Sequence, residues 1–321
     1  MLQPATLADL PAFLCAHAED ARAGTGCTVF IAPDGATCGV DVRGGGPATR
    51  ETDLLKPENM IQAVHGVVLS GGSAFGLDAA GGVQRYLEER GIGFDTGVAK
   101  VPLVSQSCLF DLGVGSKEVR PTADMAYQAC ENASRSAPAL GNVGAGTGCS
   151  IGKYRGIDRA MKSGFGTFAL QAGPVKVGAL VAVNALGDVY SPDGKVVAGL
   201  LDKKKSGLSC TLDELFSDAS PTGNLFTGNT TLGVIVTNAQ FSKTPLTKIA
   251  GMAHNGYARA IRPVHTTADG DSIYALSVGS VPGDVNLVGA LAAQAMEMAI
   301  LRAVQTAKSA YGLIGLSDLS H

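Results

Sequence analysis

The 321-residue sequence contains no tryptophan, and aromatic residues make up only 5% of it. So few aromatic side chains argue against a platform on which bases or sugars stack. Charged residues are also sparse, at 17%, and the net charge of −3 lacks the basic excess of nucleic-acid proteins. We therefore expect no nucleic-acid partner.

Long apolar runs and targeting signals are also missing. No run approaches the roughly eighteen apolar residues of a membrane span, so we expect no membrane partner. Residues 1–6 have neither the basic start nor the apolar segment of a secretory signal. The seven cysteines form no CxxC pair and, with the five histidines, no zinc-ligand spacing. This pattern predicts reduced, buried thiols in a cytoplasmic protein that holds no metal.

Glycine and apolar residues are abundant instead. Glycine accounts for 43 of the 321 residues and hydrophobic residues for 45% of the chain. Such a composition indicates tight turns, close backbone contacts and a sizeable core. The length is compatible with two domains or with one large α/β domain.

The apolar patterns predict alternating strands and helices. The predicted strands are 28–32, 65–69, 175–186, 231–237 and 272–278, and the predicted helices are 74–90, 122–135, 244–261 and 285–311. A turn at 33–35 predicts that 38–43 returns as the hairpin partner of the first strand. The polar stretch 202–228 predicts a flexible connection. This order favours a layered α/β fold with helices outside and sheets inside.

Two glycine-rich segments are similar in composition to binding loops. Residues 71–76 follow a strand, but Phe75 replaces the second glycine of a nucleophile elbow, and no lysine completes a phosphate-binding loop. Ser73 is therefore predicted to cap the following helix. Residues 144–148 fit a phosphate cradle only loosely, so close packing beside a site is the favoured interpretation. We expect no cofactor.

Residues 228–238 allow two interpretations. The first is a turn that enters a buried strand. The second is an internal cleavage point, at which the Thr230 hydroxyl attacks the Asn229 carbonyl and the resulting ester hydrolyses. The α-amine of Thr230, which has an ordinary pKa of about 7.7–8.0, would then serve as the base for its own hydroxyl.

A second polar cluster occurs at residues 263–272. Asp269 and Asp271 stand two positions apart, so on an extended strand both carboxylates would face one side, about 6–7 Å apart. Gly270 between them permits close approach of the backbone. A plain turn or a weak metal loop is the alternative, although the spacing of a calcium loop is absent. The histidines, among them His265, are expected to be structural.

These segments together resemble the DmpA aminopeptidases and their relatives, the β-peptidyl aminopeptidases and nylon-oligomer hydrolases. The resemblance extends over nearly the whole chain and is carried by residues 68–79, 141–148 with Lys153, 183–184, 228–231 and 265–271. The Asn-Thr pair at 229–230 is more similar to the nylon-oligomer hydrolase branch than to the aminopeptidases, which cleave before serine. Phe110 stands where some of those relatives carry tyrosine, so the resemblance does not decide whether nylon oligomers are the substrate.

The resemblance implies a four-layer αββα sandwich of the DmpA and ornithine acetyltransferase-like type. It implies one domain, 1–321, which cleaves itself into subunits 1–229 and 230–321 that stay together. It also implies a homo-oligomer, in which the Ala-rich helix 285–311 is a candidate subunit contact. It makes Thr230 the nucleophile and Asn229–Thr230 the cleaved bond.

Four further residues would surround Thr230: Lys153, Asn184, Asp269 and Asp271. Asn184 would donate a hydrogen bond to the oxyanion or to the Thr230 amine region. Lys153 would supply positive charge that lowers the pKa of the amine. The two aspartates would orient Thr230 and bind a cationic amine of the substrate.

The resulting hypothesis is a self-processing amide hydrolase with an N-terminal threonine nucleophile. It would remove N-terminal residues from small peptides or cleave short oligoamides. One alternative is an acyltransferase of the ornithine acetyltransferase type, which passes the acyl group to an amine instead of water. The other is an uncleaved, non-catalytic scaffold.

Overall fold

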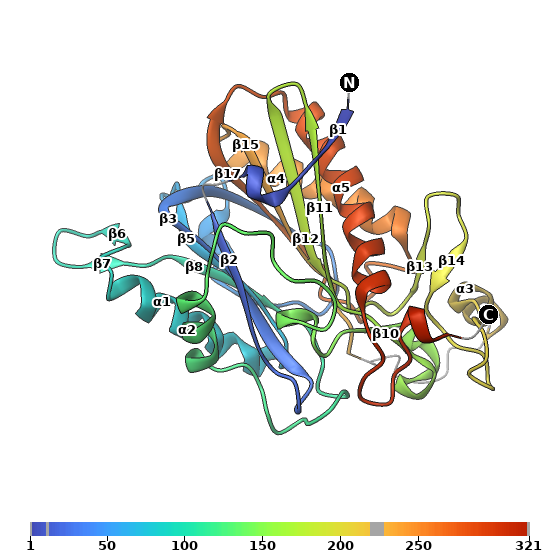
Figure 1. The fold of residues 1–321 in the computed structure, drawn as a ribbon. Coiled ribbons are helices and arrows are strands. Elements are labelled where there is room, and N and C mark those ends of the chain that lie inside the picture. Colours follow the sequence, from blue (N-terminus) through green and yellow to red (C-terminus); the bar gives the residue numbers. More distant parts are fainter. Residues whose placement is uncertain (1, 11–12, 219–227, 320–321) are drawn as a thin grey trace.

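The computed structural model describes residues 2–10, 13–218 and 228–319 (Figure 1). Its main strands are β1 (Leu2–Ala5), β2 (Leu14–Asp20), β3 (Thr25–Val42), β4 (Ala48–Arg50), β5 (Val64–Ser70), β8 (Val104–Cys108), β11 (Phe165–Ala172), β12 (Val175–Ala182), β15 (Leu232–Ala239) and β17 (Ser272–Val281). The helices are α1 (Ala79–Glu88), α2 (Ala123–Glu131), α3 (Thr211–Ser217), α4 (Lys243–Ala260) and α5 (Val285–Thr306). Short strands are β6 (Phe94–Asp95), β7 (Lys100–Val101), β9 (Ser150–Ile151), β10 (Met161–Lys162), β13 (Asp188–Tyr190), β14 (Val196–Ala198) and β16 (Ile261–Arg262).

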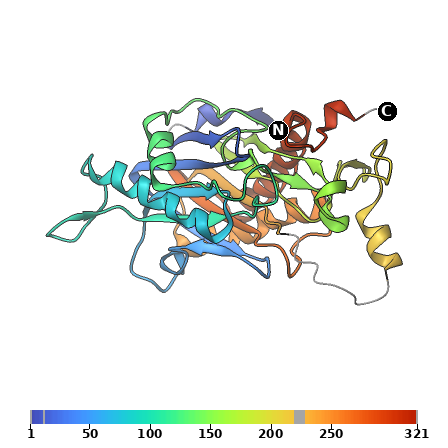
Figure 2. The same cartoon turned by 90° about the horizontal axis from the view of Figure 1, so that it is seen from below.

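The ten main strands form two sheets that share β3. The first sheet has the order β1-β11-β12-β15-β17-β3, and the second has the order β2-β3-β5-β8-β4. Helices α4 and α5 cover the first sheet, while α1 and α2 cover the second (Figures 1 and 2). The arrangement is the predicted four-layer αββα sandwich.

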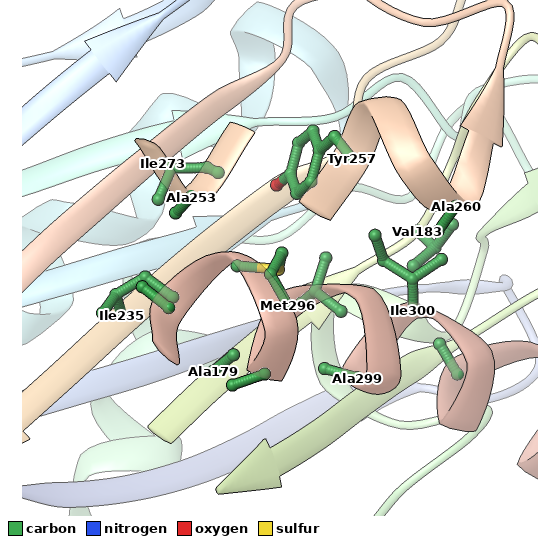
Figure 3. Close-up of a cluster of buried hydrophobic side chains, with 14 of the residues drawn as sticks. Ala179, Val183, Ile235, Ala253, Tyr257, Ala260, Ile273, Met296, Ala299 and Ile300 are labelled. Atoms are coloured by element: carbon green, nitrogen blue, oxygen red, sulfur yellow. The ribbon is translucent and has the colours of Figure 1, made fainter. Parts of the chain in front are cut away.

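Side chains that point alternately to the two faces of each sheet explain the four layers. In β12, Val177, Ala179 and Val181 face α4 and α5, whereas Leu180 belongs to the core between the sheets. Figure 3 shows part of the outer cluster, where Tyr257 of α4 and Met296 of α5 lie over strand residues. A third cluster joins the second sheet to α1 and α2. Strands buried on both faces have continuous apolar sequences, as expected for 175–186.

The predicted hairpin at 28–43 is wrong. Residues 25–42 form one long strand, in which the first half pairs with β2 and β5 and the second half with β17. The pairing register shifts between Ile31 and Ala36, where the strand passes from one sheet to the other. The local turn signal at 33–35 marks this passage, because each half has better partners elsewhere in the chain.

The helix boundaries also differ from the predicted ones. Residues 73–78 form a 3-10 helix and the α-helix begins only at Ala79. Ser73 does not cap it, since this residue itself has a left-handed φ of 53° and makes no capping hydrogen bond. Thr122 caps α2, as predicted, by accepting from the Met125 amide. Within the polar stretch 202–228, α3 forms at Thr211–Ser217, whereas 219–227 lie outside the described residues.

Helix α5 is part of the core. By length and composition it could cross a membrane, but 67% of its most apolar window is buried inside the fold. It packs on α4, β11 and β12, which gives its alanine-rich surface an internal role. The helix is thus mostly buried and not exposed along its length, and it ends at Thr306 and not at residue 311. A subunit contact through its remaining exposed face stays a prediction. All seven cysteines are free, and six of them are buried, as the sequence predicted.

Candidate active site

The central pair of parallel strands brings the predicted site residues together. Leu232 of β15 pairs with Ser272 of β17, so both strands begin at the same edge of the sheet. Thr230 lies two residues before β15, and Asp271 immediately precedes β17. The backbone N–H of Gly270 donates to Thr230 Oγ1 at 3.0 Å. The two motifs recognised in the sequence, 228–231 and 265–271, therefore meet at one point.

Thr230 is held in an unusual conformation. Its φ is 148°, a value that residues with a side chain rarely adopt and that stores backbone strain. The residue is only 3% exposed, and its N–H donates to the Asn184 carbonyl oxygen at 2.9 Å. Both the hydroxyl and the peptide nitrogen of Thr230 are thus fixed by neighbouring backbone groups.

Lys153 is a buried cation beside this peptide. Its side chain is fully enclosed, and Nζ donates to Asn184 O at 3.0 Å, Asn184 Oδ1 at 2.8 Å and Gly228 O at 3.1 Å. Burial lowers the pKa of Lys153 to about 7, although nearby anionic groups, including Asp269, oppose this shift. Lys153 Nζ and the Thr230 nitrogen therefore share one acceptor, the Asn184 carbonyl.

Asn184 links Lys153 to Thr230 through its side chain and its backbone. Its Oδ1 accepts from Lys153 and from the Ser150 amide at 3.1 Å, while Nδ2 donates to the Phe110 carbonyl at 2.8 Å. The contact to Thr230 runs through the Asn184 backbone oxygen, which accepts. In the uncleaved chain Asn184 thus accepts from both Lys153 and Thr230, and its donation to an oxyanion or to a free Thr230 amine stays a prediction for the cleaved chain.

Asp269 and Asp271 lie in the loop before β17 and not on a strand. Asp271 Oδ1 accepts from the Thr231 amide at 2.7 Å. Asp269 Oδ2 accepts from the Thr266 amide at 2.8 Å and from its hydroxyl at 2.5 Å. Burial, and then the charge of Asp271, raises the pKa of Asp269 to about 6. The aspartates orient the loop, while Gly270 between them contacts the Thr230 hydroxyl.

Asp111 is a buried residue that sequence reasoning missed. Its carboxylate accepts from the Gly72 amide at 2.7 Å and from Thr25 Oγ1 at 2.6 Å, and burial raises its pKa. A Cβ on Gly71 would lie 1.9 Å from Asp111 Oδ2. Gly71 therefore makes room for this aspartate, and Gly72 donates to it. No motif surrounds Asp111, so the sequence offered no signal for it.

Lys162 explains the second glycine-rich loop. This fully buried lysine donates to the carbonyls of Gly146, Cys149 and Ser163, and burial lowers its pKa to about 8. The N–H groups of residues 144–147 are engaged within the protein: Gly144 donates to Glu19 at 2.8 Å, Ala145 donates to Thr28 at 3.1 Å, and the next two donate to backbone carbonyls. The loop is thus packed beside the site, as predicted.

No metal ligand set accompanies these groups. Within residues 2–10, 13–218 and 228–319, no group of three or more His, Cys, Asp or Glu side chains is arranged to hold a metal ion.

Gly270→Ala is expected to slow both self-cleavage and substrate turnover by about 100-fold. The added Cβ would lie 2.6 Å from Thr230 Oγ1, so the hydroxyl must move, and misplacement by about 1 Å can cost this much. Gly113→Ala is the matched control, since nothing lies within 4 Å of its Cβ position. Cleavage followed by denaturing gel electrophoresis would decide, and equal rates in the two variants would contradict the contact.

Lys153 should add to the folding stability of uncleaved Thr230→Ala a contribution that rises with pH between about 7 and 10.5, whereas the buried cysteines, whose pKa values burial raises, act in the opposite direction above their ordinary value of 9.0. Lys153 has a pKa of about 7 in the folded chain and an ordinary value of 10.5, so in this window the unfolded chain binds the additional proton. The free energy that the unfolded chain gains by binding this proton decreases as the pH rises, so the folded chain becomes relatively more stable.

Thermal melts across this window provide the measurement. Lys153→Met, made in the Thr230→Ala background, should reduce the slope of stability against pH. Lys162 would retain part of the slope, because its pKa of about 8 acts in the same direction. The matched control is the exposed Lys204→Met, which should leave the slope unchanged. The same slope in Thr230→Ala and in Thr230→Ala with Lys153→Met would refute the lowered pKa of Lys153.

Comparison with known proteins identifies the family. Residues 6–316 match the model of peptidase family S58. The chain belongs to this family. It is 41% identical over 318 residues to an uncharacterized aminopeptidase of Mycobacterium tuberculosis, with 92% of this chain and 89% of the relative covered. It is 30% identical over 313 residues to a 6-aminohexanoate-oligomer endohydrolase of Kocuria sp., with 92% and 85% covered. As a member of this peptidase family, the chain is a hydrolase of amide bonds.

Solved structures support the fold. A β-aminopeptidase of Burkholderia sp. matches with a TM-score of 0.72 at 19% identity, covering 99% of this chain and 94% of the other. The L-aminopeptidase D-Ala-esterase/amidase of Ochrobactrum anthropi, described as a variant of the Ntn hydrolase fold, matches with a TM-score of 0.68 at 16% identity. The coverage there is 97% of this chain and 90% of the other. The S58 chain thus shares the overall fold of these enzymes, the four-layer αββα sandwich that the resemblance implied.

Proposed function

We propose that this S58 chain cleaves its own Asn229–Thr230 bond and then hydrolyses amides with Thr230 as the N-terminal nucleophile. The observation that carries the proposal is the strained, buried Thr230, whose hydroxyl accepts from Gly270 and whose N–H is held by Asn184. A threonine that only entered a strand would need neither the unusual φ nor this set of partners.

The cleavage step follows from these contacts. Thr230 Oγ1 attacks the Asn229 carbonyl carbon, so that a C–O bond forms while the C–N bond to Thr230 breaks and the nitrogen takes a proton. Water then hydrolyses the ester and leaves a carboxylate on Asn229. Breaking the bond releases the strain at φ 148°. Lys153, which donates to the Gly228 carbonyl, places positive charge beside the anion that forms during the attack.

Substrate turnover uses the amine that cleavage creates. The Thr230 nitrogen begins within hydrogen-bond distance of the same Asn184 carbonyl that Lys153 contacts. A positive neighbour favours the neutral amine, which can then take the proton from Oγ1. The hydroxyl attacks the substrate carbonyl, the leaving amine takes that proton, and water releases the acyl group.

The two subunits would remain together after cleavage. Strands β15 and β17 of the 230–321 part lie inside the first sheet, where β15 pairs with β12 and β17 pairs with β3. Helices α4 and α5 share one core with the strands of the 1–229 part. Separation would expose that core to water, at a cost that one broken peptide bond does not offset.

The proposed substrates are small peptides cleaved at the N-terminal residue, or short oligoamides. The names of the relatives support both classes, as aminopeptidases and as 6-aminohexanoate-oligomer endohydrolases. Asp269, buried near Thr230, is the candidate partner for a cationic substrate amine. Phe110 lies directly against Gly228, where a Cβ would approach its ring to 2.0 Å, and would give the vacated site an apolar wall.

Location and assembly complete the proposal. Six buried free cysteines suit the reducing cytoplasm, where we place the enzyme. We also propose a homo-oligomer, which light scattering of the processed protein would test. A monomeric mass would refute that part alone.

Product analysis separates the candidate functions. The processed protein is incubated with a short peptide and with a 6-aminohexanoate oligomer, with and without an added amine acceptor. Free N-terminal residues or shortened oligoamides in water support the hydrolase. Acyl transfer to the amine with little hydrolysis would favour the acyltransferase. No turnover of either substrate by a fully processed chain would refute the hydrolase proposal.

A further inference from the structure

His265 contacts the carboxylate that holds the backbone of the nucleophile. Its ring Nδ1 lies 2.8 Å from Asp271 Oδ2, and its backbone N–H donates to the same oxygen at 3.1 Å. The other oxygen of Asp271, Oδ1, accepts from the Thr231 amide at 2.7 Å. A continuous connection therefore runs from the His265 ring through Asp271 to the peptide that follows Thr230.

The direction of the ring contact is fixed by chemistry. An ionised carboxylate only accepts hydrogen bonds, so the hydrogen must be on His265 Nδ1. In the neutral ring Nε2 then carries the lone pair, and this buried atom has no hydrogen-bond partner among the described residues. The ring thus has one polar contact, and it is directed at Asp271.

Packing holds the ring in this orientation. Tyr257 of α4 stacks on it with ring centroids 5.9 Å apart, and His254 of the same helix meets it edge-on at 4.7 Å. His254 Nε2 contacts the Asp41 carbonyl, and burial lowers the pKa of His254 to about 4, which keeps it neutral. His265 itself has a left-handed φ of 57°, which among residues with side chains is tolerated best by Asn, Asp and His.

We propose that His265 is a positioning residue. Through Asp271 it holds the peptide group between Thr230 and Thr231 in place, and it thereby orients the Thr230 hydroxyl. Among the described residues, the polar contact of its ring is to Asp271, so its effect passes through this carboxylate. Without the ring, Asp271 would lose one of its donors and could rotate away from the Thr231 amide. The inference deepens the proposed function, on which it rests.

Three substitutions separate this role from simple packing. His265→Asn keeps the left-handed φ and places an amide N–H near the position of Nδ1. His265→Gln carries its amide one carbon further, and His265→Ala removes the donor entirely. His65→Ala is the control, because His65 belongs to β5, and its ring accepts from Leu103 and does not contact the site.

The expected result is a selective loss of rate. In His265→Ala, the rate of self-cleavage and kcat should fall about 10- to 100-fold, while KM should change less than about twofold. The reason is that the Thr230 hydroxyl is no longer correctly oriented, whereas the contacts to the substrate are kept. His265→Asn should recover most of the rate, His265→Gln much less, and His65→Ala should match the wild type. Thermal melts would show which variants are folded.

Equal rates in His265→Ala and His265→Asn, whether normal or reduced, would overturn the inference. If the proposed function itself is wrong, the result differs: the wild-type chain neither cleaves itself nor hydrolyses amides. In that case nitrogen-15 NMR of histidine-labelled protein still tests the contact. A His265 ring protonated at Nδ1, and altered by Asp271→Asn, would retain the connection, and a ring protonated only at Nε2 would overturn it.

Discussion

Thr230→Ala is expected to leave a single uncut chain of 32.5 kDa with no amide hydrolase activity. In the proposed mechanism, the substitution removes both the hydroxyl that attacks the Asn229 carbonyl and, because the bond stays intact, the free amine that serves as base. The nitrogen would still donate to Asn184, so the fold should persist. Denaturing mass spectrometry and an assay of peptide hydrolysis measure the two losses.

Thr230→Ser is the matched control for this prediction. It keeps the hydroxyl and the β-carbon and removes only a methyl group, and the resembling aminopeptidases cleave before serine. We expect it to cleave and to turn over substrate at a reduced but measurable rate. Hydrolysis by Thr230→Ala above the background of the reagents would contradict the role of Thr230, as would a cut at 229–230 in that variant.

Lys153→Met should slow self-cleavage by about 100- to 1,000-fold, the usual cost of losing one group that stabilises an oxyanion. Methionine fills the volume of the lysine stem but donates to neither Asn184 nor Gly228. In the wild type, a pKa of about 7 for Lys153 means that its positive charge is lost as the pH rises through neutrality. Cleavage should therefore be fastest below about pH 7 if this charge controls the rate.

Lys162→Met provides the comparison within the same fold. This lysine is as deeply buried, but its acceptors are the carbonyls of Gly146, Cys149 and Ser163 and not those of the cleaved segment. We expect lower thermal stability with cleavage largely retained. The cleavage rates of freshly purified precursors, followed over several pH values, give the measurement. Equal cleavage defects in Lys153→Met and Lys162→Met would mean that Lys153 acts only through the fold.

Much of the fold followed from local sequence patterns. Continuous apolar runs such as 175–186 predicted strands buried on both faces, and Thr122 predicted a helix start. The course of β3 could not be predicted, because a proline-glycine turn signal has the same sequence whether the strand reverses or passes into a second sheet. That choice depends on β17, which lies more than 200 residues further along the chain.

The site was predictable as a set of residues but not as a set of contacts. Residue patterns pointed to Thr230, Asp269 and Asp271, and the resemblance added Lys153 and Asn184. The structure brings all five together. The donor to the Thr230 hydroxyl is a backbone group, that of Gly270, which no side-chain pattern encodes. Asn184 acts towards Thr230 through its backbone oxygen for the same reason. Asp111, Lys162 and His265 required the three-dimensional arrangement.

The intact mass of the purified protein under denaturing conditions tests the central claim most directly. In proportion to 229 and 92 of the 321 residues, cleavage at Asn229–Thr230 predicts fragments of about 23 and 9 kDa, and sequencing of the smaller should begin at Thr230. Both fragments should also elute together under native conditions. A single species of 32.5 kDa that persists after prolonged incubation would contradict the account, because no free Thr230 amine would exist.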